Sequence, residues 1–322
     1  MRTSTLLLCM ALAACGDTAP APSGKSVLRI GHFPNVTHAH GLIAHQLSRQ
    51  GKGWFEERLG DGVTVEWFVY NAGPSAMEAI LADSLDLTYV GPSPALNAYV
   101  RSQGSEVRVL AGATYGGAAL VVGAGAGIAT PADFRGKSVA TPQLGNTQDV
   151  ACRAWLVGNG FSVTQTGGDV TVVPTQNADV LPLLQSGDIQ AAWTVEPWVS
   201  QLEMDAGARV FLEETDACTT ILIASERLSR EQPEIAARVR QAHEELSAWI
   251  VAHEAEAKEL IRAEITADTQ TTMPPELLDR CWPRLRFSSE IALETFQDFV
   301  SSAQASGFMQ DAGDLSRLVL PR

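Results

Sequence analysis

Apolar and polar residues alternate along the chain from Val27 onward in a pattern that predicts short strands separated by helices. Runs rich in β-branched, aromatic and leucine residues are bounded by Gly, Pro, Asn or Asp. The strands expected on this basis cover residues 28–30, 63–70, 87–90, 107–113, 118–122, 137–140, 169–173 and 190–193, and helices are expected at 37–51, 75–81, 148–157 and 178–185. Such alternation builds a mainly parallel sheet with helices on both faces, so an α/β fold is predicted.

The same alternation restarts after Gly116-Gly117, which indicates a second unit of the same kind. Residues 79-AILADSLDLTYVGPSPA-95 and 182-PLLQSGDIQAAWTVEPW-198 share a layout: a helix end, a small or acidic turn, a strand with one aromatic residue, and a helix that starts near Pro. The C-terminal third differs, with long helical stretches at 233–264 and 288–306 and a break near 273–275. We therefore expect two α/β lobes of related design.

The N-terminus has the pattern of an export signal. One Arg precedes an apolar run, Leu6 to Leu12, that is too short to span a bilayer. The run ends in Leu-Ala-Ala-Cys15, which resembles a bacterial lipobox, and a tether rich in small residues follows. We expect acylation of Cys15 and a membrane anchor for a body that begins after residue 26; a plain signal peptide cleaved near Ala14 is the alternative.

Composition and charge reduce the number of function classes that the chain can belong to. The chain has 322 residues, 45% of them hydrophobic and 19% charged, which is typical of a folded protein large enough for two modest cores. The formal net charge is −14, and an acidic surface repels phosphate backbones, so we predict no nucleic-acid binding. Of five cysteines, Cys9 and Cys15 precede the folded body, and export permits a disulfide between Cys218 and Cys281 without requiring it.

Several helices are predicted to start where small residues follow a strand. In open α/β sheets, ligands bind outside the carboxyl ends of strands, against helix N-termini. Such starts occur at Gly73-Pro-Ser75, Gly91-Pro-Ser93, Gly145-Asn-Thr147 and Glu196-Pro197, and the Phe33-Pro-Asn35 loop leaves the first strand. Each alone is explained by ordinary capping, but together they offer backbone N–H groups, hydroxyls and amides to an anion. Their recurrence predicts a small-oxyanion site that needs no cationic side chain.

Other chemistries find little support. The chain has no GxSxG, no complete GxxxxGK[ST] phosphate loop, no HExxH and no CxxC, so we predict no enzyme activity, no cofactor and no metal site. Four of the six histidines, His32, His38, His40 and His45, lie in one stretch, but their helical spacings do not suit a shared metal. We expect His40 and His45 to be solvated or half-buried; a contact between His32 and His38 across the loop stays open.

The motifs GHFPNVTHA, YNAGPSAMEAILADSLDLTYVGPSPALNAYV, LAGATYGGAALVV, LGNTQD and AAWTVEPW, in this order, resemble those of nitrate-, sulfonate- and taurine-type solute-binding proteins of ABC importers. The resemblance runs from about Leu28 to Ser225. It implies a two-lobed type II periplasmic binding fold with a two-strand hinge. Lobe 1 would comprise residues 27–115 and 219–322, and lobe 2 residues 116–218.

The resemblance also implies ligand-contacting residues in the cleft. Phe33, Tyr115 and Trp193 would form the walls, the polar residues Asn35, Ser75, Ser93, Asn146 and Thr147 would donate to an oxyanion, and His38 would lie beside them. Glu196 would either contact a ligand ammonium group, as in taurine, or cap its helix. The sequence has His32 where the resemblance leads us to expect an aromatic residue such as Tyr, which affects the choice of ligand.

The resulting expectation is a monomeric, extracytoplasmic lipoprotein that binds a small anionic or zwitterionic solute and delivers it to an ABC permease and its ATPase subunits. It would lie in the periplasm or on the outer face of the cytoplasmic membrane. The alternatives are a sensing subunit for a signalling receptor, a thiamine-pyrimidine-type protein of the same fold and a metal-binding protein.

Overall fold

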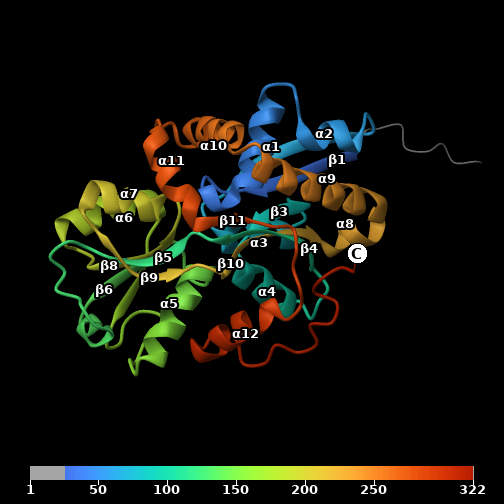
Figure 1. Cartoon of the computed structure of the whole chain (residues 1–322). Coiled ribbons are helices and arrows are strands. Elements are labelled where there is room, and N and C mark those ends of the chain that lie inside the picture. Colours follow the sequence, from blue (N-terminus) through green and yellow to red (C-terminus); the bar gives the residue numbers. More distant parts are fainter. Residues whose placement is uncertain (1–25, 322) are drawn as a thin grey trace, which may run out of the picture.

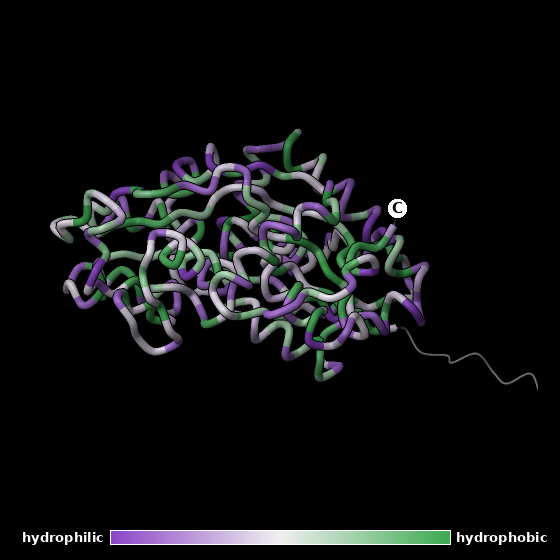
Figure 2. Tube along the Cα trace, turned by 90° about the horizontal axis from the view of Figure 1, so that it is seen from below, coloured by the Kyte–Doolittle hydropathy of each residue, from purple (hydrophilic) through white to green (hydrophobic). Residues whose placement is uncertain are grey.

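The computed structural model describes residues 26–321 and shows two β-sheets side by side, each covered by helices on both faces (Figure 1). We refer to the part built on the six-stranded sheet as lobe 1 and to the part built on the five-stranded sheet as lobe 2. Hydrophobic and hydrophilic stretches alternate along the trace throughout the molecule (Figure 2). The predicted lipidation at Cys15 lies outside the described residues.

The sheet of lobe 1 has the strand order β11-β4-β10-β3-β1-β2. Its strands are β1 (Ser26–His32), β2 (Val63–Val69), β3 (Leu87–Val90), β4 (Val107–Gly116), β10 (Cys218–Ser225) and β11 (Leu285–Phe287). β1 pairs in parallel with both β2 and β3, whereas β10 runs antiparallel between β3 and β4. The carboxyl ends of the parallel strands therefore meet at one edge of this sheet.

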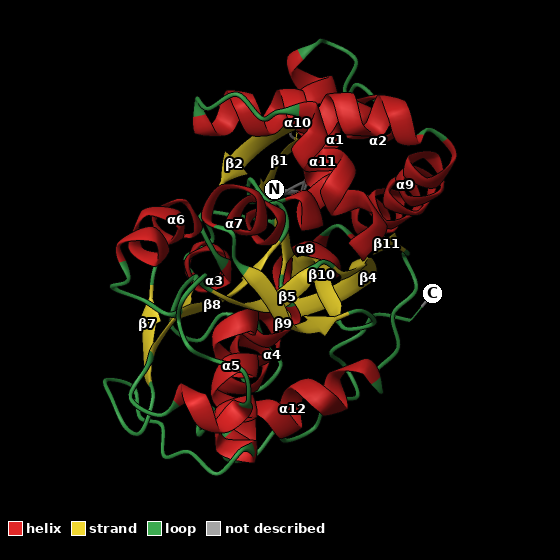
Figure 3. Cartoon of the chain, turned by 60° about the vertical axis from the view of Figure 1, so that its left-hand side comes forward, coloured by secondary structure: helices red, strands yellow, loops and turns green. Residues whose placement is uncertain are grey.

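Alternating side chains of these strands fill two cores, one on each face. Leu28, Ile30 and Leu87 pack under one helix layer, and Val90, Val107 and Ile223 pack under the other. The first layer consists of α1 (Ala39–Arg49), α2 (Trp54–Leu59), α9 (Pro233–Ala252), α10 (Glu254–Thr269) and α11 (Pro275–Cys281). The second consists of α3 (Gly73–Leu81), α4 (Pro92–Arg101) and α12 (Thr295–Ala305). The two layers lie on opposite sides of the strands (Figure 3).

The sheet of lobe 2 has the order β7-β6-β8-β5-β9. Its strands are β5 (Ala118–Val122), β6 (Ser138–Thr141), β7 (Thr171–Pro174), β8 (Ala191–Val195) and β9 (Arg209–Glu214). The trio β7, β6 and β8 is parallel, and β5 runs antiparallel to β8 and β9. One face is covered by α5 (Thr147–Gly158), the other by α6 (Asn177–Ser186) and α7 (Trp198–Ala206).

The chain passes between the lobes at two neighbouring places, after β4 and before β10. β4 and β10 pair with each other, Tyr115 opposite Cys218. Gly116 and Gly117 both have positive φ, and a side chain on Gly116 would come within 2.4 Å of the Arg284 carbonyl oxygen. Only glycine suits this crossing, which lies beside the lobe boundary that the resemblance implied between residues 115 and 116.

The remaining helix of lobe 1 is α8 (Glu226–Glu231), which follows β10. Short 3₁₀ segments lie at Val36–His38 and Trp282–Arg284 in lobe 1 and at Pro131–Phe134 in lobe 2. The predicted α/β class with two lobes is confirmed, while the lobe boundaries stay predictions. The helix expected at 288–306 is shorter because β11 and a loop precede it. Within the described residues, no helix has the length and apolar character needed to cross a membrane.

Candidate functional site

A small pocket lies between the two lobes, at the carboxyl ends of the parallel strands. Its cavity volume is about 20 Å³, room for about one water molecule. It is lined by Phe33, Asn35, Thr37, His38, Asn71, Ala72, Gly73, Gly91, Pro94, Pro142, Asn146, Thr147, Gln148, Asn177, Val195 and Thr219. Residues of both lobes contribute, so a ligand here would contact both.

Four helices begin at this pocket. α3 starts at Gly73 and α4 follows Gly91 in lobe 1, while α5 follows Asn146 and α6 starts at Asn177 in lobe 2. The N-terminal end of a helix carries partial positive charge and N–H groups that have no partner within the helix. Four such ends around one small space create a positive potential that suits an anion.

The lining offers hydrogen-bond donors but no formally charged side chain. Neither Asp, Glu, Lys nor Arg is among the pocket residues. The N-cap residues of α3, α4 and α6 accept no hydrogen bond through their side chains, whereas Asn146 caps α5 by accepting from the Asp149 N–H. The first N–H groups of α3 and α6 are therefore not capped by N-cap side chains, whereas in α4, which starts Pro-Ser-Pro, the Ser93 N–H donates to Thr147 Oγ1 of lobe 2.

His38 presents an unsatisfied polar atom at the pocket. Its side chain is buried, its ring lies against Phe33 with centroids 4.2 Å apart, and its Nδ1 has no hydrogen-bond partner. Burial, followed by the nearby His32, holds the pKa of His38 well below its usual value, so the ring is neutral at pH 7. Because an unpaired buried nitrogen is costly, a ligand that bonds it would be favoured.

Three contacts join the lobes around this pocket. Trp198 Nε1 donates to Asn35 Oδ1 at 2.8 Å, and the Ser93 N–H donates to Thr147 Oγ1 at 3.3 Å. The Val36 N–H donates to the Glu196 carbonyl oxygen at 2.9 Å. Residues of the two lobes are therefore bonded to each other at the pocket, which corresponds to a closed arrangement.

The structure brings five of the ten predicted ligand-contacting residues into this pocket: Phe33, Asn35, His38, Asn146 and Thr147. Two more lie beside it. The Ser75 hydroxyl bonds the Ala72 carbonyl oxygen and Gln143 Oε1, and the Ser93 side chain is buried near the lobe crossing. Both serine residues belong to the first turns of the helices that reach the pocket.

Tyr115 and Trp193 do not form pocket walls. The Tyr115 hydroxyl donates to the Glu290 carbonyl oxygen, and its ring lies under the Arg286 guanidinium, on the side of the C-terminal segment. Trp193 sits in the middle of β8, in the core beneath α5, with Nε1 donating to Glu214. Only Val195, at the carboxyl end of β8, reaches the pocket, since ligands contact strand ends rather than strand centres.

Glu196 is engaged elsewhere. Its carboxylate accepts from the Ser200 N–H at 3.0 Å and the Ser200 hydroxyl at 2.8 Å, and it pairs with the Arg284 guanidinium at 2.9 Å. The side chain is fully buried and absent from the pocket lining. Of the two roles considered, these contacts correspond to helix capping: the Glu196 carboxylate bonds Ser200 in the first turn of α7. It also forms an ion pair with Arg284.

Polar lining residues that sequence reasoning missed include Thr37, Asn71, Gln148, Asn177 and Thr219. Asn71 follows β2 and Asn177 begins α6 after β7, so both occupy the strand-end positions used above for other residues. A uniform search of every strand end would have found these two. Thr219 lies in the crossing strand, where the sequence carries no comparable signal.

The prediction for His40 and His45 was wrong, because both are buried. His40 Nε2 lies 2.8 Å from the Ser247 hydroxyl, and its ring packs against His243. His45 lies beside His32, not out in solvent, with its Nδ1 2.9 Å from His32 Nε2. The three cysteines in the described residues, Cys152, Cys218 and Cys281, are free, so the disulfide left open by the sequence is not formed.

Comparison with known proteins agrees with this architecture. Among curated proteins, the chain is 26% identical over 258 residues to the "Putative aliphatic sulfonates-binding protein" of Bacillus subtilis (strain 168), covering 77% of this chain and 73% of that one. It is 29% identical over 147 residues to the taurine-binding periplasmic protein of Escherichia coli (strain K12), covering 45% and 43%.

Solved structures show the same fold at lower sequence identity. The alkanesulfonate-binding protein SsuA from Xanthomonas axonopodis pv. citri, bound to MOPS, superposes with a TM-score of 0.75 at 18% identity, covering 92% of this chain and 99% of that one. The periplasmic nitrate-binding protein NrtA from Synechocystis PCC 6803 gives 0.72 at 15% identity, covering 90% and 84%. The model of the NMT1-like family matches residues 21–265, and the chain therefore belongs to that family.

Proposed function

We propose that this protein is the extracytoplasmic substrate-binding component of an ABC importer and captures a small oxyanion in the pocket between its lobes. The observation that carries the proposal is the convergence of four helix N-termini on a pocket without charged side chains. The sulfonate and taurine specificities in the names of the two curated relatives agree with this chemistry.

The pocket favours an anion over a zwitterion. A ligand ammonium group is bound most strongly by a carboxylate, and the carboxylate of Glu196 is already bound to Arg284 and Ser200. The cavity is also small, so a compact headgroup suits it better than a long chain. We propose a short sulfonate or nitrate as the ligand, with taurine as a weaker one.

Ligand binding would favour the closed arrangement, because a ligand that touches both lobes interacts fully only when they are together. The closed form would then dock on a permease that works with its ATPase subunits. We further propose that the mature protein is a monomer held at the membrane by lipid on Cys15, so that the two lobes lie in the periplasm or outside the cytoplasmic membrane.

A thermal-shift series tests this function. The purified protein, freed of bound ligand by partial unfolding and refolding, is mixed with methanesulfonate, nitrate, taurine or chloride. The proposal expects a rise in Tm with methanesulfonate or nitrate, a smaller rise with taurine, and none with chloride at equal ionic strength. Equal Tm values in all four salts would rule out a small-oxyanion binding protein.

A further inference from the structure

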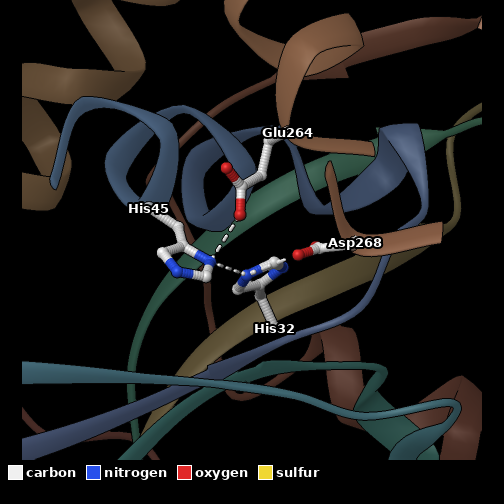
Figure 4. A group of neighbouring side chains, drawn as sticks. All are labelled: His32, His45, Glu264 and Asp268. Atoms are coloured by element: carbon white, nitrogen blue, oxygen red, sulfur yellow. Dashed lines mark hydrogen bonds and ion pairs between the residues drawn. The ribbon is translucent and has the colours of Figure 1, made fainter. Parts of the chain in front are cut away.

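Four side chains that can bind a metal ion meet inside lobe 1 (Figure 4). His32 ends β1 and His45 lies in α1, while Glu264 and Asp268 are one turn apart on the same face of α10. One donor atom from each lies within 4.8 Å of the other three. His45 Nδ1 is 2.6 Å from Glu264 Oε1 and 2.9 Å from His32 Nε2, and His32 Nε2 is 3.8 Å from Asp268 Oδ2.

The cluster is closed to solvent on most sides. The exposed fractions of the His32, Glu264 and Asp268 side chains are 0%, 0% and 1%, and that of His45 is 11%. The Trp67 ring stacks on His45 and meets His32 edge-on. Burying two carboxylates and two imidazoles in one place is costly unless their charges and lone pairs are compensated.

Arg49 supplies part of this compensation. Its Nε lies 3.0 Å from both carboxylate oxygens of Glu264, and its Nη2 lies 3.1 Å from Asp268 Oδ1. One guanidinium charge therefore faces two carboxylates. Asp268 Oδ2, which faces into that space, has no hydrogen-bond partner.

With both carboxylates ionised, no placement of hydrogens on the two rings satisfies the cluster. In the first case, His45 Nδ1 carries a hydrogen and donates it to Glu264. His32 Nε2 can then only share that same hydrogen, and Asp268 Oδ2 receives no hydrogen bond. If His32 Nε2 carries it instead, His45 Nδ1 turns a lone pair toward the Glu264 carboxylate at 2.6 Å. Adding a second hydrogen to either ring still leaves Asp268 Oδ2, 3.8 Å away, unbonded. The missing component is a centre of positive charge that all four atoms can bind.

We propose that His32, His45, Glu264 and Asp268 form a structural zinc site. Two imidazole nitrogens and two carboxylate oxygens are ligands that Zn²⁺ accepts in tetrahedral arrangement. Donor atoms around a tetrahedral zinc are about 3.4 Å apart, so the pairs at 2.6 and 2.9 Å must part by less than about 1 Å, and pairs as far apart as 4.8 Å must close by up to about 1.4 Å.

The surroundings match those of a metal site. A metal-bound imidazole usually donates its other ring nitrogen to a carbonyl oxygen, and metal-bound carboxylates accept hydrogen bonds of their own. His32 Nδ1 faces the Phe33 carbonyl oxygen at 3.5 Å, and Arg49 holds both carboxylates.

The position indicates a structural ion, not a transported one. All four ligands belong to lobe 1, and none lines the pocket between the lobes. The ion would tie α10 to β1 and α1 across more than two hundred residues of sequence. It would also fix His32, the residue directly before the Phe33 loop of the pocket.

Zinc titration of the full chain, prepared without a polyhistidine tag and stripped with a chelator, tests the site. The proposal expects one Zn²⁺ bound per chain with submicromolar Kd by calorimetry and a rise in Tm on loading. Co²⁺ should give the intense visible absorption of a tetrahedral ion. A chain that binds no Zn²⁺ at one equivalent would contradict the proposal.

Two variants separate metal binding from folding. Asp268→Asn keeps the shape and relieves repulsion with Glu264, so the metal-free variant should be at least as stable as wild type while its Zn²⁺ affinity falls at least about tenfold. His45→Gln should lose affinity to a similar or greater extent. The control His253→Gln removes an exposed imidazole and should bind Zn²⁺ as wild type does. Unchanged Zn²⁺ affinity in both Asp268→Asn and His45→Gln would overturn the assignment.

Discussion

Trp198 of lobe 2 donates its indole N–H to the side-chain oxygen of Asn35 in lobe 1, across 2.8 Å. Asn35 also lines the pocket, so this hydrogen bond links the position of a ligand-contacting residue to the contact between the lobes. Because the indole occupies Oδ1, the Asn35 NH₂ group is left to donate elsewhere. The closed arrangement thus orients a donor for the ligand.

Trp198→Phe should weaken ligand binding without unfolding the protein. A smaller aromatic ring replaces the indole, and one hydrogen bond that exists only in the closed form is lost, which is worth about 1 kcal/mol, or about fivefold in Kd. Calorimetric titration with methanesulfonate measures the change. The matched control is Trp249→Phe, since Trp249 packs against Trp54 and His253 in lobe 1, away from the pocket. Equal Kd values for the two variants would mean that the contact does not favour closure.

Glu196→Gln should reduce stability and leave ligand preference unchanged. The substitution removes the charge that pairs with Arg284 in a buried setting, and we expect a loss of about 2 kcal/mol in the free energy of unfolding. Urea denaturation measures the loss. The ratio of taurine to methanesulfonate affinity is measured in parallel. A selective loss of taurine binding would show instead that the carboxylate contacts the ligand.

Stability should fall as the pH is lowered from 7 toward 4, in part through His243. This ring is fully buried, bonded to the Gly112 carbonyl oxygen and the Tyr89 hydroxyl, and burial lowers its pKa to about 4. Between that value and the unfolded pKa of about 6.5, only the unfolded chain takes up the proton. Each unit by which the pH is lowered in this window therefore reduces the free energy of unfolding by up to about 1.4 kcal/mol.

His243→Gln provides the comparison for that pH profile. Glutamine can still donate to the Gly112 carbonyl oxygen but does not titrate, so the slope of unfolding free energy against pH between 4 and 6.5 should decrease by up to one proton. Denaturation curves at several pH values give both slopes. Parallel slopes would show that His243 is protonated in the folded protein as readily as in the unfolded chain.

Cys15→Ser should release the protein from the membrane. Acylation of Cys15 would keep the wild type in the membrane fraction, whereas a serine cannot carry the thioether-linked lipid. Cell fractionation followed by mass determination of the N-terminal peptide checks both the location and the modification. Wild-type protein with an unmodified N-terminus at this position would exclude the anchor.

The sequence predicted the strands and helix starts up to residue 195 well, because both are encoded locally, whereas β9 and β11 were not predicted. The strands at 87–90 and 118–122 were placed at their observed bounds, and Asn146 was recognised beside a helix start. Which side chains reach the pocket was harder to predict. Trp193 and Val195 lie two residues apart on the same strand, β8. Only Val195 reaches the pocket, because it lies at the carboxyl end of that strand, at the edge of the sheet.

The histidine stretch shows a second limit of sequence reasoning. Helical spacing can test whether two histidines of one helix share a metal, and it excluded such pairs. The partners of His32 and His45 are Glu264 and Asp268, more than two hundred residues away, and they are brought near by the packing of α10 on α1. No local pattern reports such a contact.

The central claim is that the pocket holds an anion at helix N-termini, and Asn146→Asp tests it most directly. Aspartate caps a helix as well as asparagine does, so α5 and the fold should be retained, but it places a negative charge on the pocket. The matched control Asn159→Asp adds the same charge at the exposed opposite end of α5. Calorimetric titration with methanesulfonate and nitrate should give 1:1 binding for wild type and control, and a Kd at least about 100-fold higher for Asn146→Asp. Binding that is equally tight in all three proteins, or absent from the wild type, would contradict the account.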